Sequence, residues 1–291
     1  MLKGVLPALI TPFTEENKIN KEGLKQNIRF LIENGVSGIV PCGTTGESAT
    51  LSMKEHEKVI EIAVECSSVP VVAGTGSNNT TEAIELTRFA YDAGAAAALL
   101  ITPYYNKPND RGMLAHFKAV ARAVDIPMIL YNVPSRTCIN LKPEITAELA
   151  KESNIIGIKE ASGSLDQVTR IIELTKNEDF VVFSGDDGLT LPIMALGGVG
   201  VVSVVANVAP KLMVSMVEAF ENGNIEKARE LHLTLAPLIR AVFLETNPIP
   251  IKKAVALIGY PAGNLRLPLA PLGEDNELKL KKALDDLKLI K

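Results

Sequence analysis

The stretch NIIGIKEASGS, residues 154–164, decides the fold that we expect for this chain. Its β-branched run Ile155, Ile156 and Ile158 is typical of a buried strand, and a glycine and serine turn follows. That strand ends on Lys159. Most lysines at strand ends only lift their ammonium group into water. A second interpretation is chemical, because an amine removed from water loses its proton more easily, and a neutral amine attacks a ketone to form a Schiff base.

The same order of a short β-rich run, a polar or glycine turn and an amphipathic helix recurs along the chain. Strict alternation favours parallel strands joined by right-handed crossovers, and eight such units close into a (β/α)8 TIM barrel. The chain has 291 residues, enough for this fold, which takes about 250. The expected strands are residues 5–10, 38–42, 69–73, 96–101, 127–131, 155–159, 180–184 and 199–204, and helices between them include 21–33, 54–66, 81–93, 112–124 and 165–175.

The pattern changes after the eighth expected strand. Helices are predicted at residues 211–221, 225–243, 250–258 and 275–289, with no strand between them. We therefore predict an α/β chain in two parts. A (β/α)8 barrel catalytic domain covers residues 1–223, and a C-terminal helical region covers residues 224–291.

Composition limits the class of function. The net charge of -4 and the isoelectric point near 5.6 argue against a nucleic-acid or anionic membrane surface, since both need a basic face. No apolar run is long enough to span a bilayer. Cys42, Cys66 and Cys138 are scattered, which favours reduced thiols in a cytoplasm, and the three histidines lack metal-binding spacing. We expect a cytoplasmic protein that acts on a small molecule without a metal.

Polar residues follow the expected strands, at the barrel end where chemistry takes place in this fold. The turn GTTGE, residues 43–47, offers backbone N–H groups and hydroxyls that suit a carboxylate. Tyr131 ends the fifth strand, faces the same opening as Lys159 and can move protons, while Arg136 can fork onto a carboxylate. Each also has a simpler structural interpretation: a glycine turn, a packed tyrosine and a solvated arginine.

These segments resemble a known family. GTTGESATL, GTGSNNTTEAIELT, TPYYNKP, YNVPSRT, NIIGIKEASG, FSGDD, NPIPIKKA and LRLPLAPL together are similar to the dihydrodipicolinate synthases, within the N-acetylneuraminate lyase family of Schiff-base aldolases. The similarity extends from the first strand to about residue 272. It implies a barrel with C-terminal helices, a homotetramer built as a dimer of dimers, and no metal or organic cofactor. It also implies condensation of pyruvate with L-aspartate 4-semialdehyde to 4-hydroxy-tetrahydrodipicolinate, in lysine (diaminopimelate) biosynthesis.

The resemblance also implies roles for single residues. Lys159 would form the covalent imine with pyruvate. Tyr131 would shuttle protons, relayed through Thr44 to Tyr105, which in this family enters the site of the neighbouring subunit. Thr45 would hold the carboxylate of pyruvate and Arg136 that of the aldehyde. Gly185 and Val201 complete the implied substrate-binding set.

A second set of residues corresponds to the site at which lysine inhibits members of this family. Glu82 can pair with the α-ammonium of the amino acid, and Tyr104 and Asn78 can bond its carboxylate. Met53 departs from the pattern, because related enzymes have a histidine or another ring there, so we expect weakened inhibition. The alternative is that these residues only pack a dimer interface. The full set is Ser48, Ala49, Met53, His56, Asn78, Glu82 and Tyr104.

Two other functions stay open. A related pyruvate aldolase acting on a sialic acid or a deoxy sugar acid would use Tyr131 and Lys159 equally, and Arg136 with the pair Tyr104-Tyr105 favours the synthase over it. The other alternative is a non-catalytic barrel that binds a keto acid as a sensor. No residue of the expected proton relay is missing, which speaks against a sensor, and borohydride trapping with pyruvate separates it from both enzymes.

Overall fold

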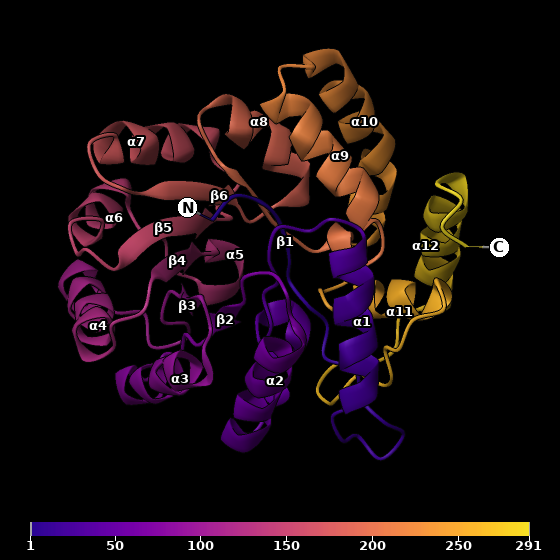
Figure 1. Cartoon of the computed structure of the whole chain (residues 1–291), viewed down its shortest axis with the longest axis horizontal. Helices are drawn as coiled ribbons and strands as arrows, with labels where there is room; N and C mark the ends of the chain where they lie inside the picture. Colours follow the sequence, from indigo (N-terminus) through magenta and orange to yellow (C-terminus); the bar gives the residue numbers. More distant parts are fainter. Residues whose placement is uncertain (1, 291) are drawn as a thin grey trace.

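A parallel sheet curled into a barrel forms the centre of the molecule (Figure 1). The computed structural model describes residues 2–290 of the chain. Its seven strands are hydrogen-bonded in the order β1-β7-β6-β5-β4-β3-β2, and all pairs are parallel. The strands are β1 Gly4–Pro7, β2 Val72–Gly74, β3 Ala97–Ile101, β4 Met128–Asn132, β5 Ile155–Glu160, β6 Val181–Ser184 and β7 Gly200–Ser203.

The strand expected at residues 38–42 is reduced to two bridging residues. Val40 N donates to Pro7 O and Ile39 N donates to Pro70 O, each at 2.9 Å, so this segment lies between β1 and β2. Pro41 has no N–H group with which to continue the ladder. The segment still fills the gap between the two edge strands, and the prediction of a (β/α)8 barrel is confirmed.

Helices surround the sheet on its outer side (Figure 1). Several begin where the sequence supplies a cap: Asn20 accepts from Gly23 N, and Ser52 forms a capping box with Glu55. Three short helices lie outside the predicted segments, because four to seven residues carry too little periodicity: α5 Pro134–Thr137, α6 Pro143–Leu149 and α8 Thr190–Ala195. The helices of the barrel are α1 Lys21–Glu33, α2 Met53–Cys66, α3 Thr80–Ala93, α4 Asp110–Ala123, α5 Pro134–Thr137, α6 Pro143–Leu149, α7 Leu165–Thr175, α8 Thr190–Ala195 and α9 Pro210–Glu221.

Side chains of the strands alternate between two apolar layers. Ile129, Tyr131 and Phe183 belong to the cluster inside the barrel. Leu130 and Ile158 instead pack outward, in a cluster that includes Phe117 of α4 and Ile171 of α7. This alternation decides which strand residues can reach the interior of the barrel.

The last three helices pack on one side of the barrel (Figure 1). They are α10 Ile225–Ala241, α11 Ile249–Leu257 and α12 Glu274–Asp286, so the predicted C-terminal helices are confirmed. One apolar cluster runs from Val5 of β1 and Val201 of β7 to Leu284 of α12. The division into units 1–223 and 224–291 stays a prediction, and this shared cluster means that both parts bury apolar surface against each other.

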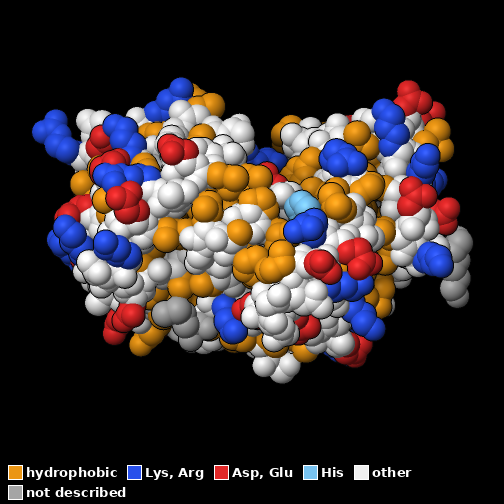
Figure 2. All heavy atoms as spheres, turned by 90° about the horizontal axis from the view of Figure 1, so that it is seen from above, with side chains coloured by type: hydrophobic (Ala, Val, Ile, Leu, Met, Phe, Trp, Pro, Cys, Tyr) orange, Lys and Arg blue, Asp and Glu red, His pale blue; other side chains and the backbone are white. Residues whose placement is uncertain are grey.

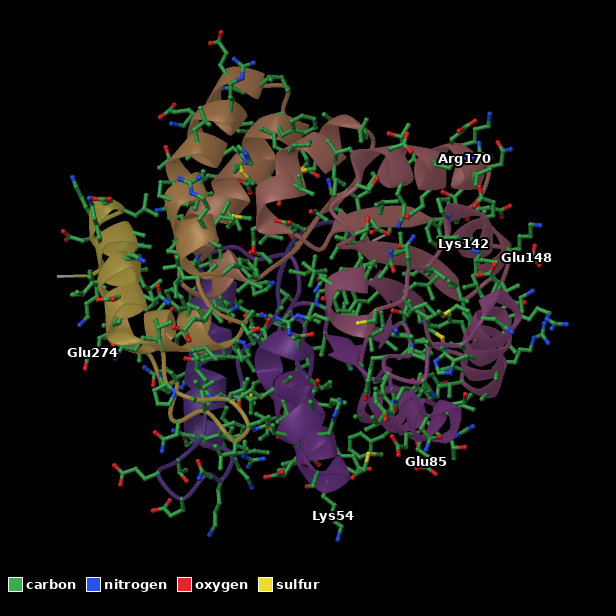
Figure 3. The ribbon with its side chains drawn as sticks, turned by 180° about the vertical axis from the view of Figure 1, so that it is seen from behind. Lys54, Glu85, Lys142, Glu148, Arg170 and Glu274 are labelled. Carbon is green, nitrogen blue, oxygen red and sulfur yellow. The ribbon has the colours of Figure 1, made fainter. Side chains whose placement is uncertain are left out.

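Charged side chains occupy the outer faces of the helices. In Figure 3 the labelled Glu148 and Arg170 lie at the outer edge of the molecule. Pairs such as Lys142 Nζ and Asp110 Oδ2, 2.8 Å apart, are exposed, so water and salt screen them and they stabilise the fold little. Within residues 2–290, no helix has the length and apolar character needed to cross a membrane. In this fold a buried reactive site lies at the mouth of the barrel, where the strands end.

Barrel closure predicts a strong effect at Gly200. Its φ of +146° suits only glycine, and an added Cβ would lie 2.0 Å from Gly4 O, the partner of Gly200 across β1 and β7. Gly200→Ala should therefore lower the free energy of unfolding by at least about 3 kcal/mol. Gly35→Ala is the control: its φ is +84° but the nearest atom is 3.7 Å away, so about 1 kcal/mol is expected. Equal losses in urea denaturation would contradict the closure argument.

Candidate active site

The register between β4 and β5 brings Tyr131 and Lys159 together. Met128 pairs with Ile155 and Ile129 with Gly157, an irregularity that skips Ile156 and sets Tyr131 opposite Lys159. Lys159 Nζ lies 4.0 Å from the centroid of the Tyr131 ring, and the two residues are 6% and 7% exposed. Within residues 2–290 the ammonium group has no hydrogen-bond or ion-pair partner. A buried amine without a counter-charge is a candidate nucleophile.

A cavity of about 490 Å³ opens next to this pair. Its volume suits a small organic molecule. Thr44 lines it from the turn after the second strand, Tyr131 from β4, and Arg136 from α5. Lys159 does not itself line the cavity, but it contacts Tyr131, whose side chain does. Residues of the C-terminal part complete the wall: Thr246, Asn247, Pro248, Pro268 and Leu269.

The turn GTTGE is held by hydrogen bonds from two other segments of the chain. Thr44–Gly46 forms one turn of 3-10 helix, and Thr11 Oγ1 donates to Gly46 O at 2.7 Å. Thr45 is 2% exposed, and its Oγ1 accepts from Asn247 Nδ2 at 3.0 Å. Thr44 thus lines the cavity, whereas Thr45 is held in the wall behind it.

Asn247 links both residues that were predicted to bind carboxylates. Besides its bond to Thr45, its backbone oxygen accepts from Arg136 Nη2 at 3.0 Å. Its side-chain Oδ1 is buried without a partner within the described residues. The sequence analysis missed Asn247 as a site residue, since its only signal is its place in NPIPIKKA, about 200 residues from the turn that it contacts.

Two buried carboxylates hold the loops around Lys159. Glu160 points to the outside of the sheet, and Asp187 follows β6. Burial raises the pKa of both carboxyl groups, and among residues 2–290 neither forms an ion pair. Each is satisfied by donors instead: Asn132 Nδ2 at 3.1 Å, Ser162 N at 2.7 Å and Gln167 Nε2 at 3.1 Å for Glu160, and Ser203 Oγ, Val204 N at 2.9 Å and Val205 N at 3.2 Å for Asp187.

Gly185 lies next to Lys159, whereas Val201 pairs with Val5 and Ser184, and neither lines the cavity. A Cβ on Gly185 would be 3.1 Å from Lys159 Cγ, so a glycine here leaves room for the lysine. Val201 is wholly buried within the apolar cluster, and only its backbone could meet a ligand. In the part of the chain that the structure describes, no group of three or more His, Cys, Asp or Glu side chains could hold a metal.

Tyr105 lies apart from this group. It is 89% exposed in the loop between β3 and α4, with a φ of +69°, and does not line the cavity. Its neighbour Tyr104 does line the cavity. Of the predicted proton relay, one chain brings together Tyr131 and Thr44 but not Tyr105.

Most of the residues predicted for lysine binding line the same cavity. Six of the seven line it, and the seventh, Asn78, donates to Tyr104 O at 3.1 Å. Glu82 accepts from Ser77 Oγ at 2.8 Å. His56 Nε2 lies 2.6 Å from Gly74 O, and burial lowers the pKa of this histidine, which keeps it uncharged at neutral pH. The six lining residues are Ser48, Ala49, Met53, His56, Glu82 and Tyr104.

Comparison with known proteins gives consistent matches along the chain. The model of the Dihydrodipicolinate synthetase family matches residues 1–287. The 4-hydroxy-tetrahydrodipicolinate synthase of Methanothrix thermoacetophila is 63% identical over 284 residues, which cover 98% of this chain and 96% of that protein. Two solved structures have the same fold. One is the synthase of Cyanidioschyzon merolae with lysine bound (TM-score 0.96, 42% identity, 99% of each chain). The other is the chloride-inhibited synthase of Acinetobacter baumannii complexed with pyruvate (TM-score 0.97, 41% identity, 100% of each chain).

Proposed function

The chain belongs to the dihydrodipicolinate synthetase family, and from this premise we propose which of its residues carry out the reaction. It is a lyase of the class I aldolase type with the activity of a 4-hydroxy-tetrahydrodipicolinate synthase, which condenses pyruvate with L-aspartate 4-semialdehyde in lysine biosynthesis. One observation carries the proposal for the site. Lys159 is a buried amine that lies over the ring of Tyr131, next to a cavity of suitable size.

The first half of the proposed reaction activates pyruvate. The neutral amine of Lys159 attacks the keto carbon of pyruvate, and loss of water from the adduct gives an imine. Protonated, the imine draws electrons from the methyl carbon, which loses a proton and becomes the nucleophilic end of an enamine. The hydroxyl of Tyr131 is the proposed proton carrier, and the covalent imine takes the place of a cofactor.

The second half joins the aldehyde. The enamine carbon attacks the aldehyde carbon of aspartate semialdehyde, whose oxygen takes up a proton to become the 4-hydroxyl group. The amino group of that substrate then attacks the imine carbon and displaces Lys159, which closes the ring. We propose that Thr45, whose hydroxyl is held by Asn247 behind the cavity wall, binds the carboxylate of pyruvate through the backbone N–H groups of its turn. Arg136, restrained by Asn247 O, would bind the carboxylate of the aldehyde.

Reductive trapping tests the covalent step. Borohydride with pyruvate should add one reduced pyruvyl group at Lys159, because its amine is buried and unpaired. Lys252 is the matched control, since it is also buried, at 2% exposure, but is paired with Glu47 and should stay unlabelled. Peptide mapping by mass spectrometry gives the answer. Label at Lys252, at surface lysines or at no residue would refute the Schiff-base assignment.

The choice of the second substrate depends on Arg136. In borohydride trapping with pyruvate, the Arg136→Ala variant should be labelled at Lys159 as the wild type is. It should, however, lose roughly 2 to 4 kcal/mol of transition-state binding, which lowers kcat/KM for the aldehyde about 30- to 1000-fold. Steady-state kinetics with each substrate varied in turn separate the two effects. Unchanged kinetics with aspartate semialdehyde would favour an aldolase of sialic or deoxy sugar acids instead.

We propose a homotetramer, arranged as a dimer of dimers, that acts in the cytoplasm. Its three cysteines are free thiols, as is usual in a reducing compartment. Tyr105 projects into solvent, which suits insertion into a neighbouring subunit, and its neighbour Tyr104 lines the cavity together with the half-exposed Met53. Figure 2 shows hydrophobic side chains across the middle of another face, which is the side of α7, α8 and α10 in Figure 1. Leu165 of α7 and Leu196, the residue after α8, are exposed apolar residues. Two apolar surfaces are what such a tetramer requires.

Subunit mixing tests the donated tyrosine. Tyr105→Phe and Thr44→Val should each lose most turnover while keeping the fold, because both hydroxyls belong to the proposed relay. When the two variants are mixed in equal amounts and exchange subunits, about half of the dimers contain one subunit of each kind. Each of these mixed dimers has one complete site out of two, so activity should return to about one quarter of the wild-type value. A mixture shown to have exchanged subunits, yet inactive, would be the contrary result.

We further propose that L-lysine binds between Glu82, His56 and Tyr104 and inhibits incompletely, since the thioether of Met53 offers little hydrogen bonding. The solved relative from Cyanidioschyzon merolae has lysine bound, which supports lysine as a ligand. Glu82→Ala should relieve inhibition. Glu85→Ala, which lies one helical turn away and is labelled on the outer face of α3 in Figure 3, should not. If calorimetry detects no binding of millimolar lysine, these residues only pack an interface.

A further inference from the structure

A buried ion pair between Glu47 and Lys252 adjoins the Thr44–Thr45 turn. The side chains of Glu47 and Lys252 are 0% and 2% exposed. Lys252 Nζ donates to Glu47 Oε1 and to Asn264 O, the latter at 2.7 Å, and lies 4.1 Å from the centroid of the Phe13 ring. The pair joins the turn after the second strand to α11, 205 residues away in the chain.

Arg266 extends the pair into a network. Its backbone N–H donates to the second carboxylate oxygen of Glu47 at 3.0 Å. Its guanidinium donates to both oxygens of Glu55, at 2.9 and 2.6 Å, and to Thr50 O at 2.9 Å. The hydrogen bond from Arg266 is the main reason why the pKa of Glu55 falls to about 2. Four charged side chains of alternating sign therefore fasten residues 47–55 to the C-terminal segment.

We propose that Glu47 and Lys252 are positioning residues for the reaction, which hold Thr44 and Thr45 at the geometry that the imine on Lys159 requires. The inference rests on the proposed function. Glu47 follows the turn directly, in the left-handed region at φ +55°, so any shift of its carboxylate moves the turn. Asn247, two residues before α11, binds Thr45 Oγ1, and both Glu47 and Asn247 line the cavity. The turn is thus fixed to one rigid element at two points.

The need for the pair follows from the short second strand. Residues 39 and 40 are the only bridging part of that strand among the described residues, so the β ladder restrains the turn weakly. If one charge is removed, its partner is left buried without compensation, and the turn must rearrange to hydrate it. Removal of both charges avoids that cost but also removes the connection.

The charge of Lys252 gives the pair a pH dependence. Burial lowers the pKa of Lys252 to about 8, although Glu47 acts in the opposite direction, and the nearby Arg266 adds to the lowering. The unfolded chain keeps this lysine protonated up to about pH 10.4. Between these values the unfolded state binds more protons, so this group makes the fold more stable, not less, as the pH rises. A loss of activity in that range would therefore reflect the local connection and not unfolding.

The test compares Lys252→Met, Glu47→Gln and the double variant with Lys253→Met. Lys253 is the neighbouring residue on α11 and forms its own ion pair with Glu277, at 2.9 Å on the surface. For each protein we would measure thermal unfolding, kcat and KM for pyruvate between pH 7 and pH 10, and borohydride trapping at Lys159. Trapping by the wild type reports on the proposed function, independently of the pair.

We expect the double variant to melt near the wild-type temperature yet to lose at least about tenfold in kcat/KM, because the turn is displaced although no charge is buried alone. The kcat/KM of the wild type should fall above about pH 8, where Lys252 loses its charge. The double variant should show no such fall, and Lys253→Met should behave as the wild type. A folded double variant with wild-type kinetics and an unchanged pH profile would overturn the inference. If no variant folds, the pH profile of the wild type is the test. A wild-type kcat/KM that stays level or rises above pH 8 would overturn the inference.

Discussion

The register between β4 and β5 is the constraint on which the site depends. Because side chains alternate along parallel strands, Tyr131 and Lys159 lie inside the barrel while Leu130 and Ile158 pack against the helices. A shift of one residue would exchange the two sets, leaving the lysine among apolar side chains of α4 and α7. The irregularity at Ile156 prevents this shift. Burial of an unpaired amine follows from barrel geometry and not from a local motif.

The C-terminal helices compensate for the weakest part of the barrel. The second strand is interrupted by Pro41 and contributes only two bridging residues, yet the turn that follows carries Thr44 and Thr45. Contacts from the segment 247–266 fix that turn and Arg136 as well. The helical extension is therefore part of the site, although most of its residues never reach the cavity.

Local patterns predicted most of the fold because alternation and helix periodicity are local properties. They predicted the strand that carries Lys159, the turn 43–47 and the C-terminal helices, but they overestimated the strand at residues 38–42 and missed short helices such as α6. They could not reveal that Asn247 or Lys252 contacts the turn, since over 200 residues separate the partners. In the sequence Lys252 cannot be distinguished from the adjacent Lys253, and only the folded structure shows that Lys252 is the buried one. The resemblance supplied roles that periodicity alone left open.

A crystal structure of the protein soaked with pyruvate tests the central claim most directly. The account predicts continuous electron density between Lys159 Nζ and the keto carbon of pyruvate, with the carboxylate hydrogen-bonded at the Thr44–Thr45 turn and the hydroxyl of Tyr131 within reach of the imine. Pyruvate bound without a covalent bond, or bound away from Lys159 while that amine stays free, would contradict it.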